Sequence, residues 1–158
     1  SVTMEALGVI ERVKNGGWRV IDRSTAQSQG EKIEIMRRAL LCDTYLTGAN
    51  AISEDGEIVN VDGNGNRVAA MTFGPKSVIV ACGMNKVVKT AEDATSRARN
   101  TAAPVNAQRF DIRTPCKTTG SCADCKSTDS ICSYIVRTRL CKPAGRIKVV
   151  LIGETLGF

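Results

Sequence analysis

Uninterrupted apolar runs predict strands that are buried on both faces. Ser77–Ala81 consists mainly of β-branched residues without polar alternation, and Arg146–Ile152 predicts a last buried strand near the end of the chain. Strands inside a parallel sheet have this composition because helices cover both of their faces. The pattern therefore predicts an α/β domain with a mostly parallel sheet.

The stretch before Ser77 predicts the unit around which this sheet is built. An apolar segment, Tyr45–Ile52, is followed by an Asp55-Gly56 turn and a second apolar segment, Glu57–Val61. A loop of glycine and asparagine (62–66) then leads into a predicted helix, Arg67–Phe73. Strand, loop, helix and strand in this order are typical of a βαβ unit.

Periodic apolar positions predict further helices at Val2–Lys14, Glu31–Cys42 and Thr90–Ala103, the last with Thr90 and Asp93 as a capping box and ended by Pro104. Trp18–Asp22 predicts a short strand, with Trp18 in the core or at its rim. We expect a single three-layer α/β domain over residues 1–158, with a cysteine-rich insert at 110–142. Parallel α/β domains usually begin with a strand, so we also expect a missing N-terminal portion upstream of Ser1.

Amino-acid composition excludes several classes of function. The formal charge is +6, but the basic residues are scattered and aromatic residues are few, so nucleic-acid binding is not expected. Histidine is absent, which excludes histidine-based triads and zinc–histidine sites. No apolar run is long enough for a membrane span, and the first residues do not resemble a signal peptide. We therefore expect a cytoplasmic protein.

The glycine- and asparagine-rich loop is the first candidate site. A helix that begins after such a loop carries unpaired N–H groups, and Gly63 and Gly65 let a ligand approach the backbone closely. The side chains that would add donors and acceptors for a small anion are Asn50, Asn60, Asn64, Asn66 and Arg67. A plain tight loop with a helix cap explains the same residues, and both interpretations stay open.

The motif Gly48-Ala49-Asn50-Ala51-Ile52, followed by Asp55-Gly56, Val59-Asn60 and Gly65-Asn66, resembles the lactate-utilisation (LUD) domain family. That family belongs to the fold group of ribose-5-phosphate isomerases, glucosamine-phosphate deaminases (NagB/RpiA-like) and CoA transferases. In related isomerases a catalytic Asp follows the Gly-Ala pair, whereas this chain has Asn50, which argues against a simple sugar-phosphate isomerase.

The resemblance also covers the start of the chain. Ser1-Val2-Thr3-Met4 is similar to the end of the family's Gly-Gly-Ser-x-Thr segment, which implies that Ser1 and Thr3 contact the ligand. The resemblance further implies a role in the oxidation of lactate to pyruvate within a multi-protein iron–sulfur system.

The second candidate site is formed by cysteines. The chain has seven, and four of them lie close together in the sequence, Cys116, Cys122, Cys125 and Cys132. This spacing favours a metal site over a disulfide framework or free thiols, with zinc and an iron–sulfur cluster equally compatible on chemistry alone. The family resemblance favours iron–sulfur. Cys141 is a spare ligand, Cys42 is structural, and Cys82 is a buried core residue rather than a nucleophile.

Three functions are compatible with these features. The first is an accessory subunit in lactate oxidation, with an iron–sulfur cluster, a small anionic ligand and other lactate-utilisation subunits as partners. The second is a non-redox domain that binds an anion, CoA or a sugar phosphate, or acts as a transferase, with structural zinc or no metal. The third is a regulatory or scaffold subunit. A homo-oligomer is compatible with each of them.

Overall fold

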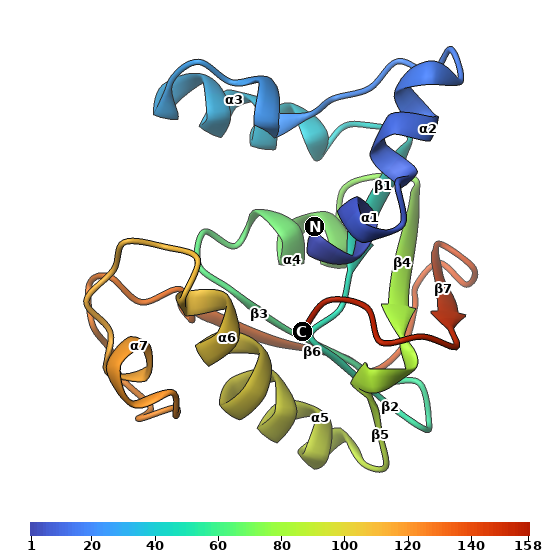
Figure 1. The fold of residues 1–158 in the computed structure, drawn as a ribbon. Helices are drawn as coiled ribbons and strands as arrows, with labels where there is room; N and C mark the ends of the chain where they lie inside the picture. Colours follow the sequence, from blue (N-terminus) through green and yellow to red (C-terminus); the bar gives the residue numbers. More distant parts are fainter.

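The computed structural model describes all residues 1–158 and shows an α/β arrangement with two sheets (Figure 1). The first sheet is parallel, in the order β1-β4-β7, and consists of β1 (Thr44–Gly48), β4 (Ser77–Gly83) and β7 (Ile147–Ile152). The predicted central strand is confirmed, because Val78 and Val80 on β4 are fully buried.

Strand β7 is present, but its predicted burial is wrong. Val149, Val150 and Leu151 are 41, 48 and 51% exposed. Strand β7 pairs only with β4 and forms the edge of the sheet, so its consecutive side chains reach solvent on both faces. An apolar run therefore marked the strand correctly without revealing its place at the edge.

The second sheet is mixed, in the order β5-β2-β3-β6. It consists of β2 (Ala51–Ser53), β3 (Ile58–Asp62), the short β5 (Val87–Val88) and β6 (Tyr134–Thr138). Strands β2 and β3 form an antiparallel hairpin around the Asp55-Gly56 turn, where Gly56 has a φ of +91°. Strand β6 comes from the predicted cysteine-rich insert and pairs antiparallel with β3.

Two sequence predictions need correction at this point. The predicted strand Tyr45–Ile52 is divided at Ala49–Asn50, where the chain passes from the first sheet to the second. The segment from β3 through α4 (Asn66–Thr72) to β4 is therefore not a βαβ unit within one sheet, because β3 and β4 belong to different sheets. Local apolar patterns identified the strands but carried no information about which strands pair.

The N-terminal helices also differ from the prediction. The helix predicted over Val2–Lys14 is divided into α1 (Val2–Ala6) and α2 (Val9–Asn15) by Gly8, which has a φ of +63°. Trp18–Asp22 forms no strand, and Trp18 is 74% exposed rather than in the core. A short 3₁₀ turn, η1 (Arg23–Thr25), and α3 (Gln29–Ala39) follow.

The helix predicted from Thr90 is longer than expected. It runs as α5 (Ala91–Arg97), a π-helical segment η3 (Ala98–Ala102) and α6 (Ala103–Ala107), and the Thr90–Asp93 capping box is present. Pro104 lies inside this helical run and does not end it. The remaining elements are the turn η2 (Met84–Lys86) and α7 (Pro115–Thr119).

Helices pack beside both sheets. Helix α1 lies beside β1 and β4, and α5 lies against β2 and β3 (Figure 1), whereas α4 lies beside β3 and β6 and packs its Met71 side chain with Val78 and Val80 of β4. Two apolar clusters result, one around Met71, Val78 and Val80 and one around Val59, Ala94 and Ala98. Arg146, at the start of β7, donates to the carbonyls of Ala70 and Met71 at the end of α4. None of the helices is both long and apolar enough to cross a membrane.

We expect substitutions at the register partners Val80 and Val149 to show the difference between the centre and the edge of the first sheet. Val80→Ala leaves a cavity beside fully buried neighbours and is expected to lower the free energy of unfolding by about 2 kcal/mol. Val149→Ala removes a half-exposed side chain and is expected to cost about 0.5 kcal/mol or less. Urea denaturation checks both values, and equal losses would contradict the edge position of β7.

Candidate functional site

Asn50 lies where the chain passes between the two sheets and joins four parts of the fold. Its side-chain oxygen accepts hydrogen bonds from the backbone N–H of Val61 at 2.8 Å and from Arg67 at 2.9 Å. Its carbonyl accepts a bond of 2.6 Å from Arg97 of α5, and its N–H donates to Asn60 at 3.3 Å. Through its side chain and its backbone, Asn50 thereby connects the end of β1 with β3, α4 and α5.

In the glycine- and asparagine-rich loop, the carboxylate of Asp62 occupies the N–H groups to which a ligand would bind. Asp62 accepts hydrogen bonds from the backbone N–H groups of Gly65, Arg67 and Val68 at 3.3, 3.0 and 3.2 Å. Gly65 has a φ of +79°, and a Cβ there would lie 3.0 Å from the ring of Tyr134 on β6. The N–H groups at the start of α4 therefore already hold an internal anion.

The other predicted loop residues lie at different depths. Asn60 is buried, and its side-chain amide donates to the sulfur of Met71 at 3.3 Å. Gly63 faces the backbone of Ile131, whereas Asn64 is exposed and Asn66 half-buried. The structure brings Asn50, Asn60 and Arg67 together, and it places the two asparagines of the loop farther out.

Three cations surround Asn50. Arg67 donates to the Val61 carbonyl as well as to Asn50, and its one nearby acid is Asp62, at 3.8 Å. Lys86, only 3% exposed, donates to the Thr3 hydroxyl at 3.0 Å and to the Ala49 carbonyl at 3.3 Å. Arg97 donates to the carbonyls of Asn50 and Asn85. Neither Lys86 nor Arg97 forms a salt bridge, so this centre carries excess positive charge.

Burial and mutual repulsion make the charged forms of these side chains energetically unfavourable. Burial lowers the pKa of the Lys86 ammonium, and the charges of Arg97 and Arg67 lower it further against the opposing effect of Cys82. Burial also lowers the pKa of the Arg97 guanidinium. Sequence reasoning missed both cations as site residues. For Lys86 the available signal was its position in the short turn that follows the buried strand β4.

The N-terminal residues Ser1 and Thr3 lie at the same end of the first sheet. A Cβ on Gly48, at the end of β1, would lie 3.1 Å from the Ser1 hydroxyl and 3.4 Å from the Thr3 hydroxyl. Thr3 is buried and accepts the hydrogen bond from Lys86. The hydroxyls that the sequence predicted as ligand contacts therefore lie on the Lys86 side of Asn50.

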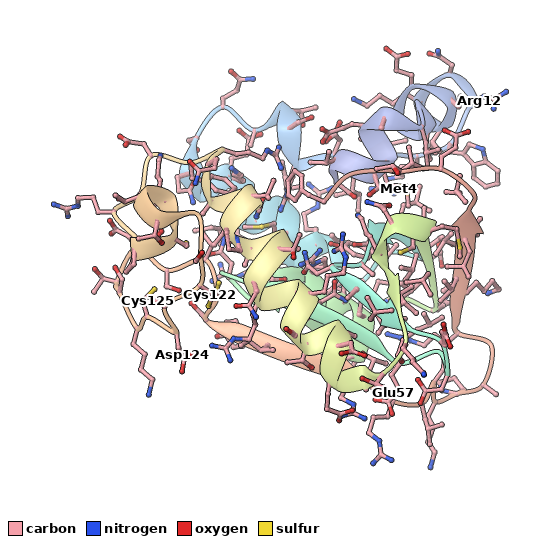
Figure 2. All side chains as sticks on the ribbon, turned by 60° about the horizontal axis from the view of Figure 1, so that its bottom comes forward. Met4, Arg12, Glu57, Cys122, Asp124 and Cys125 are labelled. Carbon is pink, nitrogen blue, oxygen red and sulfur yellow. The ribbon has the colours of Figure 1, made fainter.

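Of the four predicted metal-binding cysteines, Cys116 lies on α7 and the other three lie in the segment between α7 and β6; all are free and half-buried. Burial raises the pKa of the Cys132 thiol, and the nearby charges of Cys116, Cys122 and Cys125 raise it further. Figure 2 shows Cys122, Asp124 and Cys125 on one loop. The thiols interact electrostatically, although no three His, Cys, Asp or Glu side chains lie close enough together to hold a metal ion as they stand.

Donors surround the Cys122 sulfur. It accepts from the Asp124 N–H at 3.4 Å and from Arg99 at 3.8 Å, and Asp124 has a φ of +49°. Arg99 also forms an ion pair with Asp124. N–H donors of this kind commonly surround a sulfur that ligates a metal.

The other three cysteines lie elsewhere. Cys82 is fully buried in the first apolar cluster, and burial raises the pKa of its thiol. Cys42 donates to the Thr44 carbonyl, and Cys141 is hydrogen-bonded at the start of β7 to Pro143 and Ile147.

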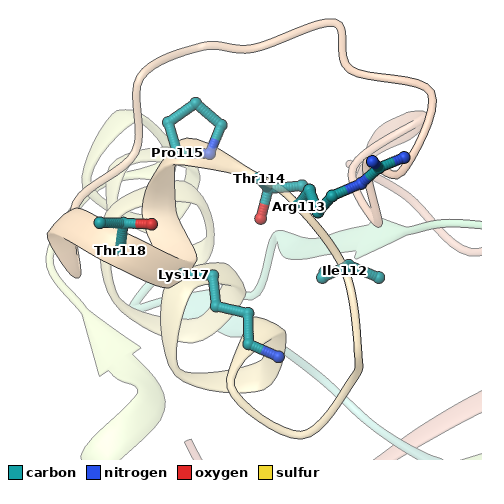
Figure 3. A pocket seen from close by; sticks show the side chains of 6 residues that line it. All are labelled: Ile112, Arg113, Thr114, Pro115, Lys117 and Thr118. Atoms are coloured by element: carbon teal, nitrogen blue, oxygen red, sulfur yellow. The ribbon is translucent and has the colours of Figure 1, made fainter.

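A hollow of about 460 Å³ lies at residues 112–118, around the start of α7 (Figure 3). Its lining is mixed and includes Ile112 and Pro115 together with the side chains of Arg113, Thr114 and Lys117. None of the three cations around Asn50 lines it. The hollow therefore belongs to the surface of the cysteine loop and is separate from the cationic centre.

The fold and the site define an α/β domain with a cationic centre at the carboxyl ends of β1 and β4. Residues 1–152 match the family model of the LUD domain, and the chain therefore belongs to the LUD, or lactate-utilisation, domain family. This confirms the resemblance of the Gly48–Ile52 motif. Neither the curated proteins nor the solved structures contain a match to the chain.

We expect Asn50→Asp to stabilise the protein. The carboxylate keeps the acceptor for Val61 and Arg67 and adds a negative charge beside cations that have one acid between them. Charge-assisted hydrogen bonds exceed neutral ones by about 1 kcal/mol, so thermal unfolding at neutral pH should show a higher midpoint. Asn64→Asp, on the exposed loop, is the matched control and should change the midpoint little. A lower midpoint for Asn50→Asp would show that the centre is not short of negative charge.

Proposed function

We propose that this LUD-domain protein is an accessory subunit in the oxidation of lactate to pyruvate. In this role it carries an iron–sulfur cluster on its cysteine loop and holds a small anionic ligand at its cationic centre. The observation that carries the proposal is the coexistence, in a LUD domain, of four neighbouring free thiols and buried cations without acidic partners.

The cluster ligands in this proposal are Cys116, Cys122, Cys125 and Cys132. Four thiolates satisfy either zinc or an iron–sulfur cluster, and the Asp124 N–H and Arg99 would offset their negative charge. The loop must close further for the four sulfurs to share one group. A cluster held by these residues would supply one-electron transfer within the multi-protein system.

The surrounding features fit the same proposal. Seven free cysteines suit the reducing cytoplasm, where we place the protein. The parallel sheet, with polar side chains at the carboxyl ends of neighbouring strands, supports assignment to the NagB/RpiA and CoA-transferase fold group. In that arrangement the anionic ligand binds at the strand ends.

A second function is a non-redox anion-binding or transferase-like domain with structural zinc or no metal. The cationic centre favours it independently of the cysteines, because its cations are present whether or not the loop holds a cluster. The two functions differ in the metal content of the native protein.

Elemental analysis of anaerobically purified protein decides between them. We expect iron and acid-labile sulfide in the wild type, and a fall to background in Cys122→Ser and Cys125→Ser because each removes one ligand. Cys42→Ser is the matched control, since Cys42 lies outside the loop, and it should keep the wild-type content. Zinc without sulfide would support the second function, and a protein with neither element would reject the electron-transfer role.

A further inference from the structure

Strand β7 has an outer edge of backbone groups without partners. In a parallel ladder, the N–H and C=O groups of one residue face one neighbouring strand, and those of the next residue face the opposite way. The Val78 N–H donates to the Arg146 carbonyl at 2.8 Å, which turns the backbone groups of Val149 and Leu151 away from β4. No strand lies on that side, and Figure 1 shows β7 at the rim of the molecule. The outward groups are therefore free to pair with a further strand.

This edge also lacks the features that usually block such pairing. Edge strands are ordinarily protected by charged side chains, by prolines or bulges, or by a covering helix or loop. The one charged residue within β7 is Lys148, and its ammonium donates to the Ser77 hydroxyl on β4 at 3.1 Å. Its side chain thus lies back across its own sheet. The next residues, Val149, Val150 and Leu151, are apolar and half-exposed.

The other sheet edges are better protected. Helix α1 packs beside β1, and the Ser1 hydroxyl lies against Gly48 at the end of that strand. Strand β5 has only two residues. Strand β6 carries Arg137, which is paired with Glu57 and Glu92. Strand β7 is therefore the edge that is best suited to the addition of a strand from another molecule.

The sequence of β7 is complementary to itself in one antiparallel register, which is centred on Val149. The opposed pairs are then Val149–Val149, Ile147–Leu151 and Lys148–Val150. A shift by two residues in one direction brings the Lys148 side chains of both copies opposite each other, and a shift in the other direction places Ile147 opposite Gly153. Like charges directly opposite each other destabilise a strand pair, and glycine offers no side chain to pack. The Val149-centred register avoids both faults.

We propose that β7 is the interface of a homodimer, in which it pairs antiparallel with β7 of a second copy about a two-fold axis at Val149. The outward groups of Val149 in the two copies exchange hydrogen bonds, and each Leu151 N–H donates to the Ile147 carbonyl of the other copy. Two-fold dimers use the same surface patch on both copies, which a self-complementary strand provides. The inference goes beyond the proposed function and does not depend on it.

The pairing fixes the arrangement of the dimer. The joined sheet contains β1, β4 and β7 of each copy without a break. Because the two β7 strands run in opposite directions, the carboxyl ends of the strands, and with them the two cationic centres, lie at opposite ends of this sheet. A contact between two six-residue strands is at the low end of specific interface sizes, so the dimer is expected to dissociate on dilution.

Sedimentation equilibrium of the full chain between about 1 µM and 1 mM tests the proposal. The wild type is expected to pass from the mass of one chain, 16.9 kDa, to twice that mass. Val149→Lys and Val149→Glu each place like charges opposite each other at the axis, so each is expected to raise the dissociation constant about tenfold or more. An equimolar mixture of the two variants brings opposite charges together and should associate more tightly than either variant alone.

Controls separate the interface from folding. Leu41→Lys is the matched control, because Leu41 is 90% exposed and lies outside β7, and it should associate like the wild type. The Val149 variants leave the ladder with β4 intact, so their thermal midpoints under dilute conditions should stay close to that of the wild type. If they do not fold, Leu151→Lys decides, because Leu151 belongs to the same outer edge and its substitution should weaken the dimer in the same way.

Three results would overturn the proposal. The first is a wild type that keeps the mass of one chain over the whole concentration range. The second is a dimer that the folded Val149 variants, or Leu151→Lys where that variant decides, leave unchanged, because a different surface then holds the copies together. The third is a mixture of the two Val149 variants that associates no more than its components, because two-fold pairing at Val149 requires their opposite charges to meet.

Discussion

The arrangement of this protein depends on the hydrogen bonds of Asn50. The chain leaves a parallel sheet at Gly48 and enters a mixed sheet at Ala51, and between them a single side chain holds β3 through Val61 and α4 through Arg67. The carbonyl of the same residue holds α5 through Arg97. The amide at this position supplies an acceptor oxygen without a charge, so the junction is held without an internal counter-ion.

The lack of a counter-ion leaves the positive charge of the cationic centre uncompensated. Carbonyl oxygens, rather than carboxylates, accept most of the hydrogen bonds from Arg67, Lys86 and Arg97. A carbonyl satisfies a donor but does not cancel its charge, so the folded chain retains unfavourable repulsion that an acid at position 50 would relieve. Groups kept in such a state, with pKa values displaced by burial, are typical of binding sites, where the ligand completes the electrostatics. The glycine- and asparagine-rich loop differs, because there the carboxylate of Asp62 already accepts hydrogen bonds from the N–H groups at the start of α4.

The sequence predicted those parts of the fold that local pattern determines. Val78, Val80 and Ala81 are buried, as expected from an apolar run without polar alternation, and the Thr90–Asp93 cap depends on residues three apart. The exposure of Trp18 and of β7 could not be predicted, because it depends on which elements pack nearby. The sheet to which each strand belongs could not be predicted from the sequence either. The motif around Asn50 marked the site, but Lys86 and Arg97 reach it from elements distant in sequence, and only the fold brings them there.

The two candidate centres are joined by one helical segment. Arg97 and Arg99 are two residues apart, at the passage from α5 into the π-helical η3. The first binds the Asn50 carbonyl, and the second binds Asp124 and the Cys122 sulfur on the cysteine loop. In a regular α-helix, residues two apart point to different sides, and the widened turn of a π-helix provides local freedom in how they do so. Because the loop is tied to this helix by charge, any closure of its thiols around a metal acts on the segment that also positions Arg97. The cationic centre and the cysteine loop are therefore in contact with the same helical segment.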